Sequence, residues 1–237
     1  MNRELYLCSL LMLAVFAGMI WYLADYVSSN QEALFNNSYN SQQRVLAQEN
    51  TRGTIYAGTG EVLAQTVIAE DGTSVREYPY KNIFAHVVGY TDKGKTGIEE
   101  LENYQLIHSD ISDREKLDHE LAGEKNPGND VYTTLDTSLQ QAASDALGLY
   151  RGAIVVTEVK TGRVLAMVSK PDYDPNKIAE NWETLSTDKD KAALVNRGTQ
   201  GLYPPGSTFK IVTALAYIRQ NPDNWQNYHY QCNGAYI

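Results

Sequence analysis

The strongest pattern of apolar positions is an unbroken run near the N-terminus. Residues 5–24 contain no charged side chain, and their 20 positions give the length that a helix needs to cross a bilayer. A cleaved signal peptide is the alternative, but its apolar region is shorter and ends at an A-x-A-like site, to which residues 22–24 are a poor match. The pattern predicts an uncleaved transmembrane anchor within residues 1–27.

Charge around this run predicts its orientation. Arg3 precedes it, and no Lys or Arg occurs over residues 25–43. Positive charge is retained on the cytoplasmic side of a membrane, so we expect a cytoplasmic N-terminus and an extracytoplasmic remainder. Residues 28–50 are rich in Ser, Asn and Gln, which predicts a polar stalk leaving the membrane.

Short apolar segments follow the stalk. Residues 61–68 have the β-branched content of a strand, residues 83–90 form a second strand-like run, and residues 97–107 have helical spacing with acidic residues in the first turn. Residues 108–129 are polar and charged and end in Asn-Pro-Gly, so we expect a surface connection there.

A second group of segments alternates strand and helix signals. Residues 131–135 are strand-like, and Asp136 is placed to cap a helix whose apolar positions recur at i, i+3, i+4, i+7 and i+8 from Leu139. Apolar runs at 153–156 and 164–168, joined by a short turn containing Gly162, predict a β-hairpin. Residues 170–176 should be loop, and residues 178–196 partly helical.

The last apolar run follows a turn that carries candidate catalytic residues. Pro204, Pro205 and Gly206 cannot continue a helix, whereas residues 211–218 are almost wholly apolar, so a turn is expected to lead into a buried helix. Ser207 would lie at the N-terminus of this helix, with Lys210 one turn further on the same face. Burial and the helix dipole both disfavour an ammonium there, so the pair is typical of a nucleophile and its base.

This S-x-x-K pattern is short, and the alternative is structural. Ser207 could be a helix N-cap, with Lys210 a solvated residue of the first turn. Ser186 and Lys189 fit the same pattern, but they lie in a polar run without an apolar helix behind it, so we exclude them as a catalytic pair.

Residues 89–96 match G-x-x-x-x-G-K-[ST], the phosphate-binding P-loop. A P-loop domain also needs a parallel sheet and a downstream strand ending in a magnesium-binding Asp. The best candidate strand ends at Thr157-Glu158 and turns directly into a hairpin, so nucleotide binding is the minor alternative.

Composition narrows the classes of function. With 237 residues, 43% hydrophobic content and a net charge of -9, the chain fits an acidic ectodomain better than a nucleic-acid-binding protein, which usually carries a basic face. Two cysteines, Cys8 and Cys232, exclude a disulfide framework within the soluble part of this sequence. The four scattered histidines have no metal-ligand spacing, so we expect neither a metal nor an organic cofactor; they are His86, His108, His119 and His229.

The order of several short motifs resembles the class B penicillin-binding proteins, particularly the penicillin-binding protein A branch. The matching segments run from the anchor to the C-terminus in the family's order. They are residues 52–55 with 60 and 63–64, 78–80 with 84–90, 96–99, 134–136 with 139–140, 161–162 with 164–167, 171 with 173–176, 196–198 and 201–210.

This resemblance implies an α+β fold with four parts. They are a cytoplasmic tip and transmembrane anchor (1–27), a polar stalk (28–50), a mixed α/β N-terminal pedestal resembling a dimerisation domain (51–149), and the start of a β-lactamase-like transpeptidase domain with an antiparallel sheet and helices (150–237). It also places residues 89–99 on a family motif of the pedestal, which accounts for the P-loop string.

The activity implied is that of a D,D-transpeptidase of peptidoglycan, with Ser207 as nucleophile and Lys210 as base. The implied partners are peptidoglycan stem peptides, β-lactam antibiotics, the membrane and a membrane glycosyltransferase, with no nucleic acid. A non-catalytic membrane-anchored β-lactam sensor or scaffold of the same fold is the alternative, since it would share the serine and the lysine.

The chain departs from the family pattern in two places. Ala57-Gly58 stand where the family usually has Asp-Arg, which puts one pedestal contact in doubt. The family's S-x-N and K-T-G motifs are expected after the nucleophile, but Ser207 is the last serine, and the two Lys-Thr-Gly strings, at 95–97 and 160–162, both precede it. We therefore expect the sequence to be a fragment cut inside its transpeptidase domain and inactive alone.

Overall fold

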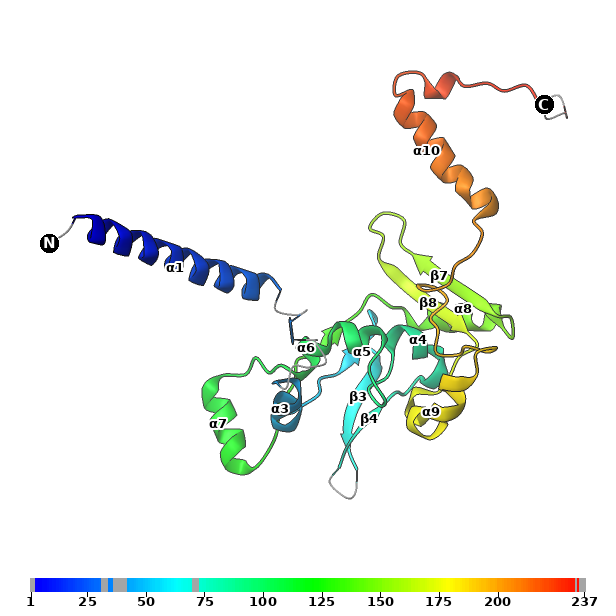
Figure 1. Ribbon diagram of the computed structural model, residues 1–237. Helices are drawn as coiled ribbons and strands as arrows, with labels where there is room; N and C mark the ends of the chain where they lie inside the picture. The colour runs from blue at the N-terminus through cyan, green and yellow to red at the C-terminus, as the bar shows by residue number, and fades with distance from the viewer. Residues whose placement is uncertain (1–2, 31–33, 36–41, 70–72, 233, 235–237) are drawn as a thin grey trace. The chain divides into compact units, whose positions relative to one another are not determined.

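The structure is a computed structural model that describes residues 3–30, 34–35, 42–69, 73–232 and 234. It divides into two compact units, residues 1–200 and residues 201–237, which are described separately. The first helix, α1 (Arg3–Ser29), covers the predicted anchor, and it is the one helix of the described residues that is long and apolar enough to cross a membrane (Figure 1).

The first unit contains a four-stranded mixed sheet in the order β4-β3-β2-β6. Strand β3 (Val62–Ile68) pairs antiparallel with β4 (Ser74–Glu77) and with β2 (Ile55–Tyr56), and β2 pairs in parallel with β6 (Val131–Tyr132). A second, parallel pair joins β1 (Asn50–Thr51) to β5 (Asn126–Pro127). The strand expected over residues 61–68 is thereby confirmed, and the strand expected over residues 131–135 is confirmed only at Val131–Tyr132.

Short helices flank these strands. They are α3 (Gln42–Glu49), the 3₁₀ turn η1 (Lys81–Ile83), α4 (Ala85–Val88), α5 (Gly97–Leu101), α6 (Asn103–Ile107) and α7 (Asp113–Ala122). The helix expected over residues 97–107 is present but broken at Glu102. The strand-like interpretation of residues 83–90 is wrong, because this run forms η1 and α4 and ends at Gly89, whose φ of 90° favours glycine.

Two polar segments contain helices that their composition does not predict. Helix α3 lies within the expected stalk, where the Asn103 side-chain amide donates a hydrogen bond of 3.3 Å to Gln43 Oε1. Helix α7 lies within the expected surface connection, and a capping box holds its start, with Ser112 Oγ accepting from the Glu115 N–H while Glu115 accepts from the Ser112 N–H.

The first unit continues with the predicted helix and hairpin. Asp136 caps α8 (Thr137–Leu147), its Oδ1 accepting a 2.8 Å hydrogen bond from the Leu139 N–H. Strands β7 (Gly152–Thr157) and β8 (Val164–Lys170) form an antiparallel pair against which α8 packs (Figure 1). The 3₁₀ turn η2 (Pro175–Lys177) and α9 (Ile178–Thr187) follow, as expected for a loop and a partly helical segment.

Two apolar clusters form the core of the first unit. The larger joins the β2–β3 pair to η1, α4 and α6 through Ile55, Leu63, Phe84, Val88 and Leu106, all nearly inaccessible to solvent. The smaller gathers Ala85, Tyr90, Tyr173 and Ile178, with Trp182 packed against it. Strands, helices and a mixed sheet together confirm the α+β class.

Candidate active site

The candidate nucleophile lies in a 3₁₀ turn that continues directly into a helix. Gly206 has a φ of 53°, the turn η3 spans Gly206–Phe209, and α10 spans Lys210–Gln220 (Figure 1). The expected order of proline turn, serine and apolar helix is therefore present. Neither η3 nor α10 begins with a side-chain cap, so the structure does not use Ser207 as an N-cap.

The two candidate catalytic residues are neighbours through the backbone. The N–H of Lys210 donates to the carbonyl oxygen of Ser207, which places the two side chains one turn apart. No hydrogen bond joins their side chains among the described interactions, and both are exposed. An apo arrangement of this kind still permits proton transfer, because catalytic contacts often tighten only when substrate binds.

The expected burial of the helix is absent. None of the described residues of the second unit is buried, and the apolar side chains of α10 remain open to solvent, Ile211 at 67%, Val212 at 52% and Leu215 at 60%. The prediction of a buried helix is therefore wrong for the described residues. Nothing among them removes Lys210 from water, so the desolvation that would activate it is not provided by this part of the chain.

The segment leading to the nucleophile is held firmly in the first unit. Arg197 donates from Nη2 to the Lys191 carbonyl at 2.6 Å and from its backbone N–H to Ser169 Oγ on β8 at 3.0 Å. Asn196 Nδ2 donates to the His86 carbonyl at 3.3 Å, which ties this segment to α4. The chain is thus fixed to the β8 strand and to the pedestal about ten residues before Ser207.

The rejected S-x-x-K pair lies in a different setting. Ser186 is in the last turn of α9, where its Oγ donates to the Glu183 carbonyl at 3.3 Å, and Lys189 follows the end of the helix. A serine at a helix C-terminus has carbonyl oxygens beside it rather than N–H groups, so this pair could not stabilise an oxyanion. Of the Lys-Thr-Gly strings, residues 160–162 form the turn between β7 and β8, with Gly162 at a φ of 76°.

The P-loop string connects two short helices and does not follow a strand. A Cβ on Gly89 would lie 1.8 Å from the Thr96 carbonyl oxygen, so the two ends of the loop are pressed together. The N–H of Thr96 donates to the Tyr90 carbonyl at 3.3 Å across this contact. The glycine is needed for close packing of backbone, and the strand–loop–helix geometry of a nucleotide-binding loop is absent here.

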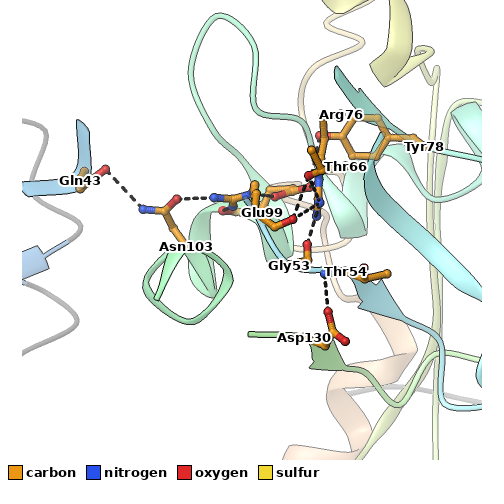
Figure 2. Close-up of polar contacts among 10 residues, drawn as sticks. Gln43, Gly53, Thr54, Thr66, Arg76, Tyr78, Glu99, Asn103 and Asp130 are labelled. Carbon is orange, nitrogen blue, oxygen red and sulfur yellow. Dashed lines mark hydrogen bonds and ion pairs between the residues drawn. The ribbon is translucent and has the colours of Figure 1, made fainter. Parts of the chain in front are cut away.

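A buried charge cluster lies close to this loop and was not foreseen from the sequence (Figure 2). Glu99 is completely buried and accepts from two arginines, Arg52 Nε to Oε2 at 2.6 Å and Arg76 Nε to Oε1 at 2.7 Å. Arg52 also donates to the Asn103 side chain at 2.8 Å. Burial, and secondarily the Glu99 charge, raise the pKa of Tyr78, whose hydroxyl lies 3.3 Å from Oε1 of Glu99.

The part of the chain that the structure describes contains no group of three or more His, Cys, Asp or Glu side chains that could hold a metal ion. His86, the one buried histidine among those described, instead bonds through Nε2 to the Ala193 carbonyl at 2.7 Å, and burial lowers its pKa.

Comparisons with known proteins agree with the order of these elements. The family described as "Penicillin binding protein A dimerisation domain" matches residues 52–131, and the "Penicillin binding protein transpeptidase domain" matches residues 152–235. The second match includes Ser207 and Lys210.

Curated relatives give the same assignment. The peptidoglycan D,D-transpeptidase PbpA of Mycolicibacterium smegmatis is 39% identical over 198 residues, covering 75% of this chain and 40% of that protein. The peptidoglycan D,D-transpeptidase MrdA of Escherichia coli K12 is 34% identical over 185 residues, covering 62% of this chain and 29% of that protein. The chain therefore spans about two fifths or less of the length of these relatives.

A solved structure shares the fold. Penicillin-binding protein A of M. tuberculosis, as its imipenem acyl-enzyme complex, is 35% identical and superposes with a TM-score of 0.64, covering 73% of this chain and 43% of that one. Sequence identity, matched domains and fold thus point the same way. The chain belongs to the class B penicillin-binding proteins, with a dimerisation domain of the penicillin-binding protein A type followed by part of a transpeptidase domain.

Proposed function

We propose that the complete protein is a peptidoglycan D,D-transpeptidase that works through a serine acyl-enzyme on Ser207. The observation that carries the proposal is the position of Ser207 in a turn leading directly into α10, with Lys210 one turn away, inside the residues matched by the transpeptidase family. The curated relatives named above are D,D-transpeptidases, and the M. tuberculosis protein forms an acyl-enzyme with imipenem.

In the proposed reaction, Ser207 Oγ attacks the carbonyl carbon of the penultimate D-Ala of a stem peptide. Lys210 accepts the hydroxyl proton, the C–N bond to the terminal D-Ala breaks, and the amine leaves with a proton. An amine of a neighbouring stem then attacks the ester and releases Ser207. The backbone N–H of Ser207 supplies one donor for the oxyanion.

Residues 1–237 alone are proposed to be inactive. Ser207 and Lys210 are both exposed, and α10 presents uncovered apolar side chains. The described residues provide no apolar surface around Lys210 of the kind that activates a lysine as a base. Activity therefore requires protein surface that covers α10 and desolvates Lys210.

The protein is proposed to be anchored by α1 as a single-pass membrane protein with a cytoplasmic N-terminus. This orientation rests on Arg3 before the span and on the absence of Lys and Arg over residues 25–43. The transpeptidase would then face peptidoglycan outside the membrane, where a membrane glycosyltransferase supplies the glycan strands. β-Lactams, which resemble the D-Ala-D-Ala end, are the expected inhibitors.

The test is labelling of the complete protein with a fluorescent penicillin. Ser207→Ala should abolish labelling, and Lys210→Met should slow acylation by about 10²–10⁴-fold, the usual contribution of a general base. Ser186→Ala is the matched control, since it removes the serine of the other S-x-x-K pair. Equal labelling of the Ser207→Ala variant and the wild type would refute the assignment.

Penicillin labelling alone does not separate an enzyme from a sensor of the same fold. The complete protein should also exchange the terminal D-Ala of a stem-peptide substrate for a labelled D-amino acid. A protein that is acylated by penicillin but performs no exchange would be a sensor or scaffold.

A further inference from the structure

A basic cavity in the pedestal is not used by the proposed reaction. It has a volume of about 250 Å³ and is bounded by α3, β1, β4 and the loop that carries the P-loop string. Four of the residues that line it are cationic, Arg52, Arg76, Lys95 and Lys125, and none of the described residues lining it is acidic. Polar uncharged side chains, including Thr91, and the apolar Ala47 and Ile107 complete the wall.

One of the arginines that line the cavity has an unused donor. The Arg76 side chain is 7% exposed, and its Nε is taken by Glu99 and its Nη1 by the Gly53 carbonyl at 2.7 Å and Thr66 Oγ1 at 3.1 Å. Its Nη2 is buried and has no hydrogen-bond partner among the described residues. A buried, unsatisfied guanidinium nitrogen is rare and costs stability unless a ligand or water meets it.

The charge of the cavity is also unbalanced. Glu99, which pairs with Arg52 and Arg76, and Glu100, which acts on Lys95, offset the four cations only in part, so an excess of positive charge remains. Burial, and secondarily the Arg52 charge, lower the pKa of Lys95, and these two effects outweigh the opposing influence of Glu99 and Glu100. No hydrogen bond or ion pair engages the Lys95 side chain within the described interactions.

We infer that this cavity binds a phosphate group, held by Arg76 Nη2, Lys95 and Lys125. Inorganic phosphate or a phosphate monoester carries about 1.5–2 negative charges at pH 7 and offers at least three acceptor oxygens, which suits this excess of charge and donors better than a single carboxylate. The cavity is below the range of about 300–1,000 Å³ typical of small-molecule sites, so it suits a phosphate group and not a whole nucleotide.

Two sources could supply this group, free phosphate or the headgroup of a membrane lipid. The second rests on the proposed membrane insertion of α1. Helix α3, which lines the cavity, begins at residue 42, 13 positions after α1 ends at residue 29, a stretch of at most about 45 Å if fully extended. The cavity is therefore within reach of the bilayer surface. Binding of free phosphate does not depend on insertion or on transpeptidation.

The experiment titrates inorganic phosphate and, separately, soluble dihexanoyl-phosphatidic acid into the full chain in non-ionic detergent, with calorimetry as the readout. Lys95→Gln should weaken phosphate binding by about tenfold or more, as expected for loss of one charge-assisted hydrogen bond, and Lys125→Gln should also weaken it. Lys160→Gln, which removes one positive charge from the exposed β7–β8 turn, should leave the affinity unchanged.

Tighter binding of phosphatidic acid than phosphate, lost in Lys95→Gln and displaced by phosphate, assigns the group to a lipid. The reverse order assigns it to free phosphate, and either result supports the site. Arg76→Lys, which can keep the Glu99 ion pair while removing Nη2, should weaken both ligands. Three results would each overturn the proposal. One is equal phosphate affinity in the wild type, Lys95→Gln and Lys160→Gln. The others are no phosphate binding at all and acetate binding as tight as phosphate binding.

Discussion

The buried Glu99 is expected to be one of the most stability-sensitive positions of the pedestal. Glu99→Gln keeps the size of the side chain and removes its charge. Arg52 and Arg76 would then face a neutral amide, each buried without its counter-ion. The two guanidinium groups would repel each other and keep only neutral acceptors, such as the Asn103 side chain and the Gly53 carbonyl, in place of the charge that compensates their removal from water.

The magnitude follows from this geometry. Both ion pairs are short, at 2.6 and 2.7 Å, and the Glu99 side chain is 0% exposed, so water does not screen the electrostatic interaction that the substitution removes. Removing one partner of such a buried pair destabilises a protein by about 3–5 kcal/mol. For a unit of this size, this corresponds to a decrease in melting temperature of roughly 6–20 °C.

The assay is urea unfolding of the full chain in detergent, followed by tryptophan fluorescence, because Trp182 packs against the core cluster that includes Tyr90. Glu100→Gln is the matched control, as it removes the same charge from the exposed neighbouring position on α5. The control should lose less than about 0.5 kcal/mol. Equal stabilities of the Glu99 and Glu100 variants would refute the reasoning about the buried cluster.

Other predictions concern single elements of the first unit. Gly89→Ala should destabilise the protein far more than Gly94→Ala in thermal unfolding, because an added Cβ would meet the Thr96 carbonyl at 1.8 Å in the first case and nothing within 4 Å in the second; similar losses would contradict the close approach. Burial lowers the pKa of His86 below its ordinary 6.5, so below that pH the unfolded chain binds a proton that the folded chain does not. The free energy of unfolding is therefore unaffected by His86 titration above pH 6.5. It decreases as the pH falls below 6.5, by up to about 1.4 kcal/mol per pH unit. His86→Gln should flatten that pH dependence in urea unfolding at pH 7.5 and 5.5, and an unchanged slope would exclude His86 as its source. Asp136→Ala should cost about 1 kcal/mol through loss of the α8 cap, whereas Asp136→Asn should cost little.

Elements with strong local signals could be predicted from the sequence. The α8 helix has an aspartate cap and a regular apolar period, and the β7–β8 hairpin has two apolar runs around Gly162, so neighbouring residues alone determine them. Helix α7 was not predicted because its polar sequence lacks a periodic pattern of apolar residues. The Ser112–Glu115 capping box did indicate where the helix begins.

Features made by distant residues could not be predicted in this way. Charged side chains are normally exposed, and nothing near Glu99 in the sequence indicates that Arg52, 47 positions away, and Arg76, 23 positions away, meet it in the core. Likewise the apolar run of α10 predicted a buried helix, but burial requires a covering surface that the described residues do not provide. The nucleophile motif is local, whereas the environment of Lys210 depends on tertiary contacts.

The most direct test of the account is to locate the penicillin adduct on the complete protein by tryptic digestion and mass spectrometry. Cleavage after Arg197 and Lys210 releases residues 198–210, a peptide whose single serine is Ser207. The account predicts one penicilloyl group on this peptide, with fragmentation assigning it to Ser207. An adduct on the peptide of residues 178–189, which carries Ser186, or no adduct at any serine, would contradict it.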